Sequence, residues 1–153
     1  MNLLSVIFRV KRPSCIADMQ AMVNTFICRK DFAGIMLFGW IFTNSRSVAD
    51  SLNSSYSVMK NHEMIHLRQA QSTANNWFRY YALYLAFWLR GICLARKRRL
   101  LAYYLNPFEM EAYLNERNMH YLDRFENGVT GWKEYRKMTI AERYRVMKRS
   151  GKI

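Results

Sequence analysis

The sequence predicts an α+β fold, formed by one mainly helical domain over residues 1–153 with a small β-sheet in its N-terminal half. Three observations lead to this prediction. Apolar residues make up 51% of the chain, which excludes a disordered protein and is enough for one sizeable core. Segments before residue 43 combine β-branched and aromatic residues with glycines, as short strands do. After residue 57, apolar residues recur at the period of a helix, and recognisable capping residues mark the helix ends.

The N-terminal part contains several candidate elements. Residues 1–12 alternate weakly between apolar and polar and are rich in Val, Ile and Phe, which predicts a strand. Residues 16–28 have apolar spacing near the helical period, which predicts a first helix. Residues 32–42 carry two glycines among aromatic and aliphatic side chains, which favours one or two buried or edge strands. Residues 43–57 are rich in Ser, Asn and Asp, which predicts a loop.

A central helix is expected over about 57–71, with a break at Asn75-Asn76. The apolar and aromatic stretch 77–105 follows. It predicts either a helical hairpin or one long kinked helix, with the bend at Gly91.

Caps place the last helices. Asn106 is a good N-cap and the proline after it is favoured at the first helical position, so a helix is expected over about 107–125. A loop is expected over 127–131. The Thr-x-x-Glu capping box at 139–142 predicts a last, very basic helix over 140–148.

The chain is strongly basic, with a net charge of +13. This charge favours an acidic partner, which could be anionic lipid, nucleic acid or an acidic substrate. Because no RNA-binding motif accompanies the basic C-terminal segment, nucleic acid is not the expected partner. Three cysteines without a C-x-x-C pair argue against disulfides and fit a reducing, cytoplasmic compartment. The apolar N-terminus precedes its basic residues, which is the reverse of a secretory signal.

The aromatic stretch 77–94 has three interpretations. It could be a buried helix of the core, or a peripheral contact with a membrane surface, which its Trp, Tyr and flanking basic residues would suit. A full membrane span would have to accommodate Arg79 and Arg90 near its ends. The first two interpretations are favoured, so we expect a cytoplasmic protein that can associate peripherally with an anionic membrane.

The most informative motif is H-E-x-x-H, formed by His62, Glu63 and His66. On a helix, residues four apart project from one face, so the two imidazoles form half of a tetrahedral zinc site. Glu63 lies next to that face and can take a proton from an attacking water molecule. Two of the chain's three histidines are used in this motif.

A catalytic zinc site usually needs a third protein ligand. The downstream candidates are Glu109, with its neighbour Glu111, and His120. Glu109 would also suit the third position of a capped helix without any metal. Glu111 is expected to be a surface carboxylate and His120 a surface or partly buried residue.

The segment Glu109-Met110-Glu111-Ala112-Tyr113 follows H-E-x-x-H at the start of a helix. In this order the two motifs resemble those of the gluzincin group of zinc metallopeptidases, in particular the small single-domain gluzincins and the catalytic part of the integral-membrane CAAX prenyl proteases. The resemblance covers about a fifth of the chain.

This resemblance implies a zincin-like fold and a Zn²⁺ ion held by His62, His66 and Glu109. It implies that Glu63 is the general base of peptide-bond hydrolysis. Tyr113, where many members have Asp, would support a ligand or donate to the oxyanion, and His120 is the alternative donor. The extended peptide or protein substrate would align along an edge strand, for which 32–42 is the candidate.

Other interpretations remain open. The protein could bind zinc without catalysis and act on a membrane surface or a protein partner through its basic, aromatic face. A nucleic-acid-binding protein with an accidental H-E-x-x-H is the third hypothesis. Arg68 and Gln69, which follow the motif, could brace the site, but a solvated helix face is the expected role.

Overall fold

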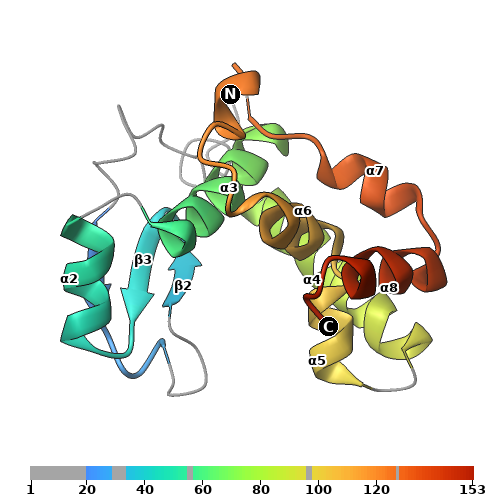
Figure 1. Ribbon diagram of the computed structural model, residues 1–153, viewed down its shortest axis with the longest axis horizontal. Coiled ribbons are helices and arrows are strands. Elements are labelled where there is room, and N and C mark those ends of the chain that lie inside the picture. Colours follow the sequence, from blue (N-terminus) through green and yellow to red (C-terminus); the bar gives the residue numbers. More distant parts are fainter. Residues whose placement is uncertain (1–19, 29–33, 55–56, 96–97, 127) are drawn as a thin grey trace.

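The computed structural model describes residues 20–28, 34–54, 57–95, 98–126 and 128–153. The fold is α+β and mainly helical, with a small sheet near its N-terminal end, as predicted. Figure 1 shows the sheet and helix α2 on one side of the molecule and helices α4 to α8 on the other, with α3 running between them. The strand predicted over 1–12 lies outside the described residues.

The sheet has three strands in the order β1-β3-β2: β1 (Ala21–Val23), β2 (Gly34–Leu37) and β3 (Trp40–Thr43). Strands β2 and β3 form an antiparallel hairpin, which confirms the strands predicted over 32–42, and β1 pairs with β3 in parallel. Within the described sheet, β2 therefore lies at an edge.

The helix predicted over 16–28 is wrong in its described part, because 21–23 is strand β1. Although the apolar residues of this segment are spaced as in a helix, pairing with β3 holds it in an extended conformation. The Asn53 side chain also holds both backbone groups of Ala21, accepting from its N–H and donating to its carbonyl.

The loop predicted over 43–57 is also wrong, because helix α2 (Arg46–Ser54) forms there. Among its Ser, Asn and Asp residues, a few apolar side chains form one narrow face of the helix. Ala49 and Leu52 are buried, and α2 packs with this face against β1 and β3. Tertiary burial, rather than local propensity, stabilises this helix.

Helix α3 (Val58–Ser72) confirms the central helix. The Ser57 side chain caps it by accepting from the Lys60 N–H. It packs against β2 on one side and against α4 and α6 on others. The break predicted at Asn75-Asn76 is confirmed: Ala74 and Asn75 adopt left-handed conformations, with φ of 60° and 54°.

Helices α4 (Trp77–Leu94) and α5 (Arg99–Tyr104) form the helical hairpin that was one of the two predicted options. The bend, however, follows Leu94, and Gly91 remains within α4. A Cβ atom at Gly91 would lie 3.2 Å from the Ala102 Cβ. The glycine therefore permits close packing of the two helices and does not turn the chain.

Helix α6 (Pro107–Asn115) begins where the Asn106 cap predicted, but it ends well before residue 125. The reason is a tertiary contact. The Asn61 side-chain amide on α3 donates to the carbonyls of Glu116 and Asn118, at 2.8 and 3.1 Å, as the chain leaves α6. These carbonyls would otherwise accept hydrogen bonds from a continuing helix.

A 3₁₀ turn, η2 (Leu122–Arg124), and helix α7 (Trp132–Lys137) follow, and α7 was not predicted. Helix α8 (Ile140–Arg149) confirms the last predicted helix, including its capping box. Among the described residues, no helix is both long enough and apolar enough to cross a membrane.

Candidate metal centre

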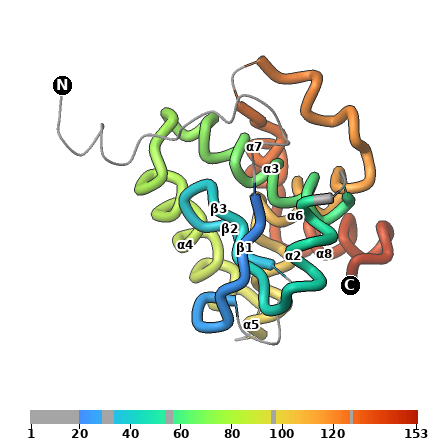
Figure 2. Tube along the Cα trace, turned by 90° about the vertical axis from the view of Figure 1, so that its left-hand side faces the viewer, coloured from blue at the N-terminus to red at the C-terminus, as the bar shows by residue number. Residues whose placement is uncertain are grey.

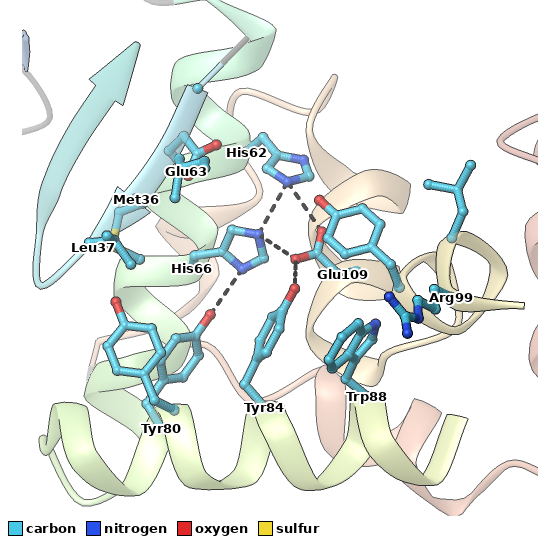
Figure 3. Close-up of a pocket in the computed structure, with 15 residues that line it drawn as sticks. Met36, Leu37, His62, Glu63, His66, Tyr80, Tyr84, Trp88, Arg99 and Glu109 are labelled. Carbon is cyan, nitrogen blue, oxygen red and sulfur yellow. Dashed lines mark hydrogen bonds and ion pairs between the residues drawn. The ribbon is translucent and has the colours of Figure 1, made fainter. Parts of the chain in front are cut away.

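The side chains of His62, His66 and Glu109 converge between α3 and α6 (Figure 3). The two histidine Nε2 atoms lie 3.1 Å apart, as expected for residues one helical turn apart. Glu109 occupies the first turn of α6, which the Asn106 cap begins. Its carboxylate oxygens lie 3.6 Å from His62 Nε2 and 3.5 Å from His66 Nε2.

These distances fit a metal ion. Two ligand atoms about 2.05 Å from a tetrahedral zinc ion lie about 3.3 Å from each other, within a few tenths of an ångström of the three separations. All three residues are buried. The Glu109 Oε2 atom is buried and accepts no hydrogen bond among the described residues, so it lacks the partner that a cation would supply. The group could therefore hold a metal ion, whose identity the geometry leaves open.

The remaining polar atoms of the three residues are held by neighbours. His62 Nδ1 lies 2.9 Å from Glu116 Oε2, and His66 Nδ1 lies 2.9 Å from Gln69 Oε1. With their protons on Nδ1, both rings direct the lone pair of Nε2 toward the common centre. The Tyr84 hydroxyl on α4 donates to Glu109 Oε1 at 2.7 Å (Figure 3).

Glu116 is a functional candidate to which the sequence assigned no role. Its second oxygen accepts from Lys152 Nζ at 2.6 Å, so the C-terminal segment is tied to the site. Burial alone would raise the pKa of Glu116, but hydrogen bonds with His62 and Lys152 outweigh it and lower the pKa. Glu116 therefore stays ionised and can orient His62. Its spacing of seven residues from Glu109 is the only signal that pointed to this position.

Gln69 and Glu111 form a buried polar network beneath the site, which corrects the expectation of a solvated helix face for Gln69 and a surface carboxylate for Glu111. Gln69 Nε2 donates to Glu111 Oε2 at 2.8 Å, and the Tyr121 hydroxyl donates to Glu111 Oε1 at 2.7 Å. Burial raises the pKa of Glu111 despite these bonds. Since Gln69 Oε1 also accepts from His66 Nδ1, the network positions that candidate ligand.

Arg68, the neighbour of Gln69, points elsewhere. Its guanidinium donates to the Gln71 side chain and to the Phe125 carbonyl. It thereby anchors the loop after η2 to α3.

Of the two sequence candidates for the oxyanion donor, Tyr113 lies beside His62 and His120 lies on the exposed surface. The Tyr113 ring packs edge-on against the His62 ring, with centroids 4.5 Å apart, and its hydroxyl lies 3.3 Å from that of Tyr103. His120 is exposed and pairs with Asp123, because α6 ends before this position. The structure thus brings Tyr113 against the candidate ligand His62 and leaves His120 outside the site.

Glu63 is buried on the side of α3 that faces β2, and Figure 3 shows it between the histidines and the strand. Burial raises its pKa, against the opposing effects of His62, His66 and a hydrogen bond from the Met36 backbone. A carboxylate with a raised pKa is a stronger base than one in water.

The histidines hold protons strongly when no metal is present. Burial would lower the pKa of His62, but the nearby Glu109 carboxylate and the hydrogen bond with Glu116 raise the pKa to about 10. The pKa of His66 is also raised, because the nearby Glu109 outweighs burial. A metal ion would therefore have to displace at least one proton from this centre.

A cavity of about 640 Å³ opens beside the triad. Strand β2 forms one wall of the cavity, and His62, Glu63, His66 and Glu109 also line it. The remaining walls are largely aromatic, with Arg99 at the edge shown in Figure 3. The aromatic residues are Tyr80, Tyr81, Tyr84, Trp88 and Tyr103.

Comparisons of the chain with protein-family models, curated proteins and solved structures gave no match. A functional assignment therefore depends on the arrangement of the chain's own residues, and above all on the buried His-His-Glu group that could hold a metal ion.

Proposed function

We propose that this protein is a zinc-dependent peptidase of the gluzincin type. The observation that carries the proposal is the convergence of His62, His66 and Glu109 at a cavity that also contains the Glu63 carboxylate. Two imidazoles and one carboxylate, with room for a fourth ligand on the cavity side, are a typical donor set for catalytic zinc. When bound, zinc would polarise a peptide carbonyl and make a water molecule more acidic.

Glu63 is the proposed general base. It would accept a proton from the attacking water and deliver it to the departing amine. Its position supports this role, because it lines the cavity and is the next residue to the ligand His62. Its raised pKa supports the role as well, since proton uptake is favoured in this buried environment.

Strand β2 is the proposed guide for the substrate backbone. It pairs only with β3 among the described residues, so its other edge can accept an extended peptide. Residues 34–37 line the same cavity as the metal-binding triad. A peptide added to this edge would pass over the centre, with side chains entering the aromatic part of the cavity.

Tyr103 is the proposed donor to the oxyanion. It lines the cavity, and burial together with Glu109 raises its pKa, so its hydroxyl keeps its proton. Tyr113, the sequence candidate, lies against His62, and its hydroxyl is 3.3 Å from that of Tyr103. We assign Tyr113 the role of positioning both His62 and Tyr103.

The test combines metal analysis with a substitution of the base. The purified protein should contain one zinc ion per chain and cleave peptides from a mixed library. Glu63→Gln should keep the zinc and lose cleavage by at least about 100-fold. Glu134→Gln, which changes an exposed carboxylate on α7, is the matched control. Zinc-free protein, or cleavage that Glu63→Gln leaves unchanged, would contradict the proposal.

The second candidate is a metal-binding protein without catalysis that acts at a membrane or on a partner. The exposed apolar and basic surface of α4, described below, favours it. Stoichiometric zinc without any Glu63-dependent cleavage would support this alternative.

A further inference from the structure

Helix α4 exposes an apolar stripe along one of its faces. Phe78, Leu85 and Leu89 are 69%, 50% and 50% exposed. With the exposed Ala82 and Cys93, they recur at the spacing of one helical face. The opposite face packs into the core. Three large apolar side chains in a row on one face are more than the scattered exposure of a typical surface.

The charge around this stripe has one sign. The sequence contains no acidic residue between Glu63 and Glu109. Four arginines of this segment are exposed, and none of them forms an ion pair among the described residues. These are Arg79, Arg90, Arg98 and Arg99.

The β2–β3 turn adds a second, independent feature. Phe38 is 52% exposed and adopts a φ of 51°, a left-handed conformation that disfavours a bulky aromatic residue. Its ring contacts the Trp77 and Tyr81 rings at 6.0 and 5.2 Å, so the turn lies against the first turns of α4. A strained and exposed phenylalanine beside an apolar stripe indicates that this side chain has a function outside the folded core.

We propose that the α4 stripe and Phe38 form a docking surface for an anionic lipid bilayer. The stripe would enter the interface with the α4 axis parallel to the membrane, and the exposed arginines would contact acidic headgroups. Because no described helix can cross a bilayer, docking at the surface is the mode that the helix permits.

Charge distinguishes this partner from a second copy of the chain. A symmetric dimer through the stripe would bring the arginines of two chains together with no acid between residues 64 and 108 to pair with them. An anionic bilayer supplies both an apolar layer and negative charge. Docking on a bilayer does not require peptidase activity.

The test is vesicle flotation of the full chain. Binding is expected to vesicles made of equal parts phosphatidylcholine and phosphatidylserine, and to be weak with phosphatidylcholine alone. The variant Leu85→Glu with Leu89→Glu should bind at least about 30-fold more weakly, because two half-exposed leucines no longer enter the interface. Phe38→Ser, in the turn, should weaken binding to a smaller extent.

The matched control is Ser47→Glu with Ser51→Glu, which adds the same two acids to exposed positions of α2. Figure 2 shows α2 and α4 on opposite sides of the sheet. This control should retain vesicle binding, and circular dichroism should show every variant folded. Failure of the unmodified protein to bind anionic vesicles would overturn the proposal. So would equal losses in the α2 and α4 variants, or a stable dimer that Leu85→Glu with Leu89→Glu dissociates.

Discussion

His62 Nδ1 lies 2.9 Å from Glu116 Oε2, and this contact joins α3 to the end of α6 across 54 positions of the chain. Lys152 holds the other oxygen of the same carboxylate. The orientation of one metal-ligand candidate therefore depends on three separate segments, and each can be altered without changing the ligand itself.

Glu116→Gln should weaken zinc binding by about 10- to 100-fold, the usual effect of removing a group that orients a ligating histidine. The amide is neutral, so it stabilises His62 less than the carboxylate does. Competition with a chelator measures the affinity. Glu134→Gln, at an exposed carboxylate, should leave it unchanged. An affinity unaffected by Glu116→Gln would show that Glu116 does not orient His62.

Zinc should stabilise the folded protein through Glu109. A free zinc concentration about 1,000 times the dissociation constant stabilises the folded state by about 4 kcal/mol. For a chain of this size, this raises Tm by about 8–16 °C. Glu109→Gln removes one ligand and should abolish most of the shift, whereas Glu142→Gln, at an exposed position of α8, should retain it. Thermal denaturation with and without zinc decides between these outcomes.

Zinc affinity should fall as the pH falls. The pKa of His62 in the metal-free site is about 10, so at neutral pH this histidine carries a proton that zinc must displace. Each displaced proton lowers the apparent affinity about tenfold for every pH unit of acidification. Chelator competition between about pH 8 and pH 6 measures the slope. An affinity independent of pH would contradict binding through the histidines.

Tyr103→Phe should lower kcat for peptide cleavage by about 100-fold or more while zinc remains bound, since one donor to the oxyanion is lost. Tyr113→Phe should have a smaller effect, because its hydroxyl acts through Tyr103. Tyr144→Phe, on the exposed face of α8, is the control. If Tyr113→Phe were the more damaging change, the oxyanion donor would be the tyrosine that the sequence first indicated.

Local features of the fold and site were predictable. The spacing of His62 and His66 places both on one face of any helix, and the Asn106 cap predicted where α6 begins, which brings Glu109 into its first turn. The caps before α3 and α8 were predictable for the same reason: each involves hydrogen bonds between residues a few positions apart.

Features that depend on distant segments were not predictable. Helix α2 forms because Ala49 and Leu52 find an apolar surface on the sheet. Helix α6 ends early because the Asn61 amide, more than 50 positions away in the sequence, donates hydrogen bonds to the carbonyls that follow α6. Neither contact has a local pattern from which it could be inferred.

The sequence by itself determined the candidate ligands and base, since H-E-x-x-H and the capped helix at Glu109 are local signals. Only the tertiary structure decided that Glu109 meets the histidines, that Glu116 orients His62, and that Glu111 is buried. The physical reason is that these side chains find their hydrogen-bond partners across the interface between α3 and α6. That interface depends on how the side chains of two helices distant in sequence pack together, and no local sequence pattern specifies this packing.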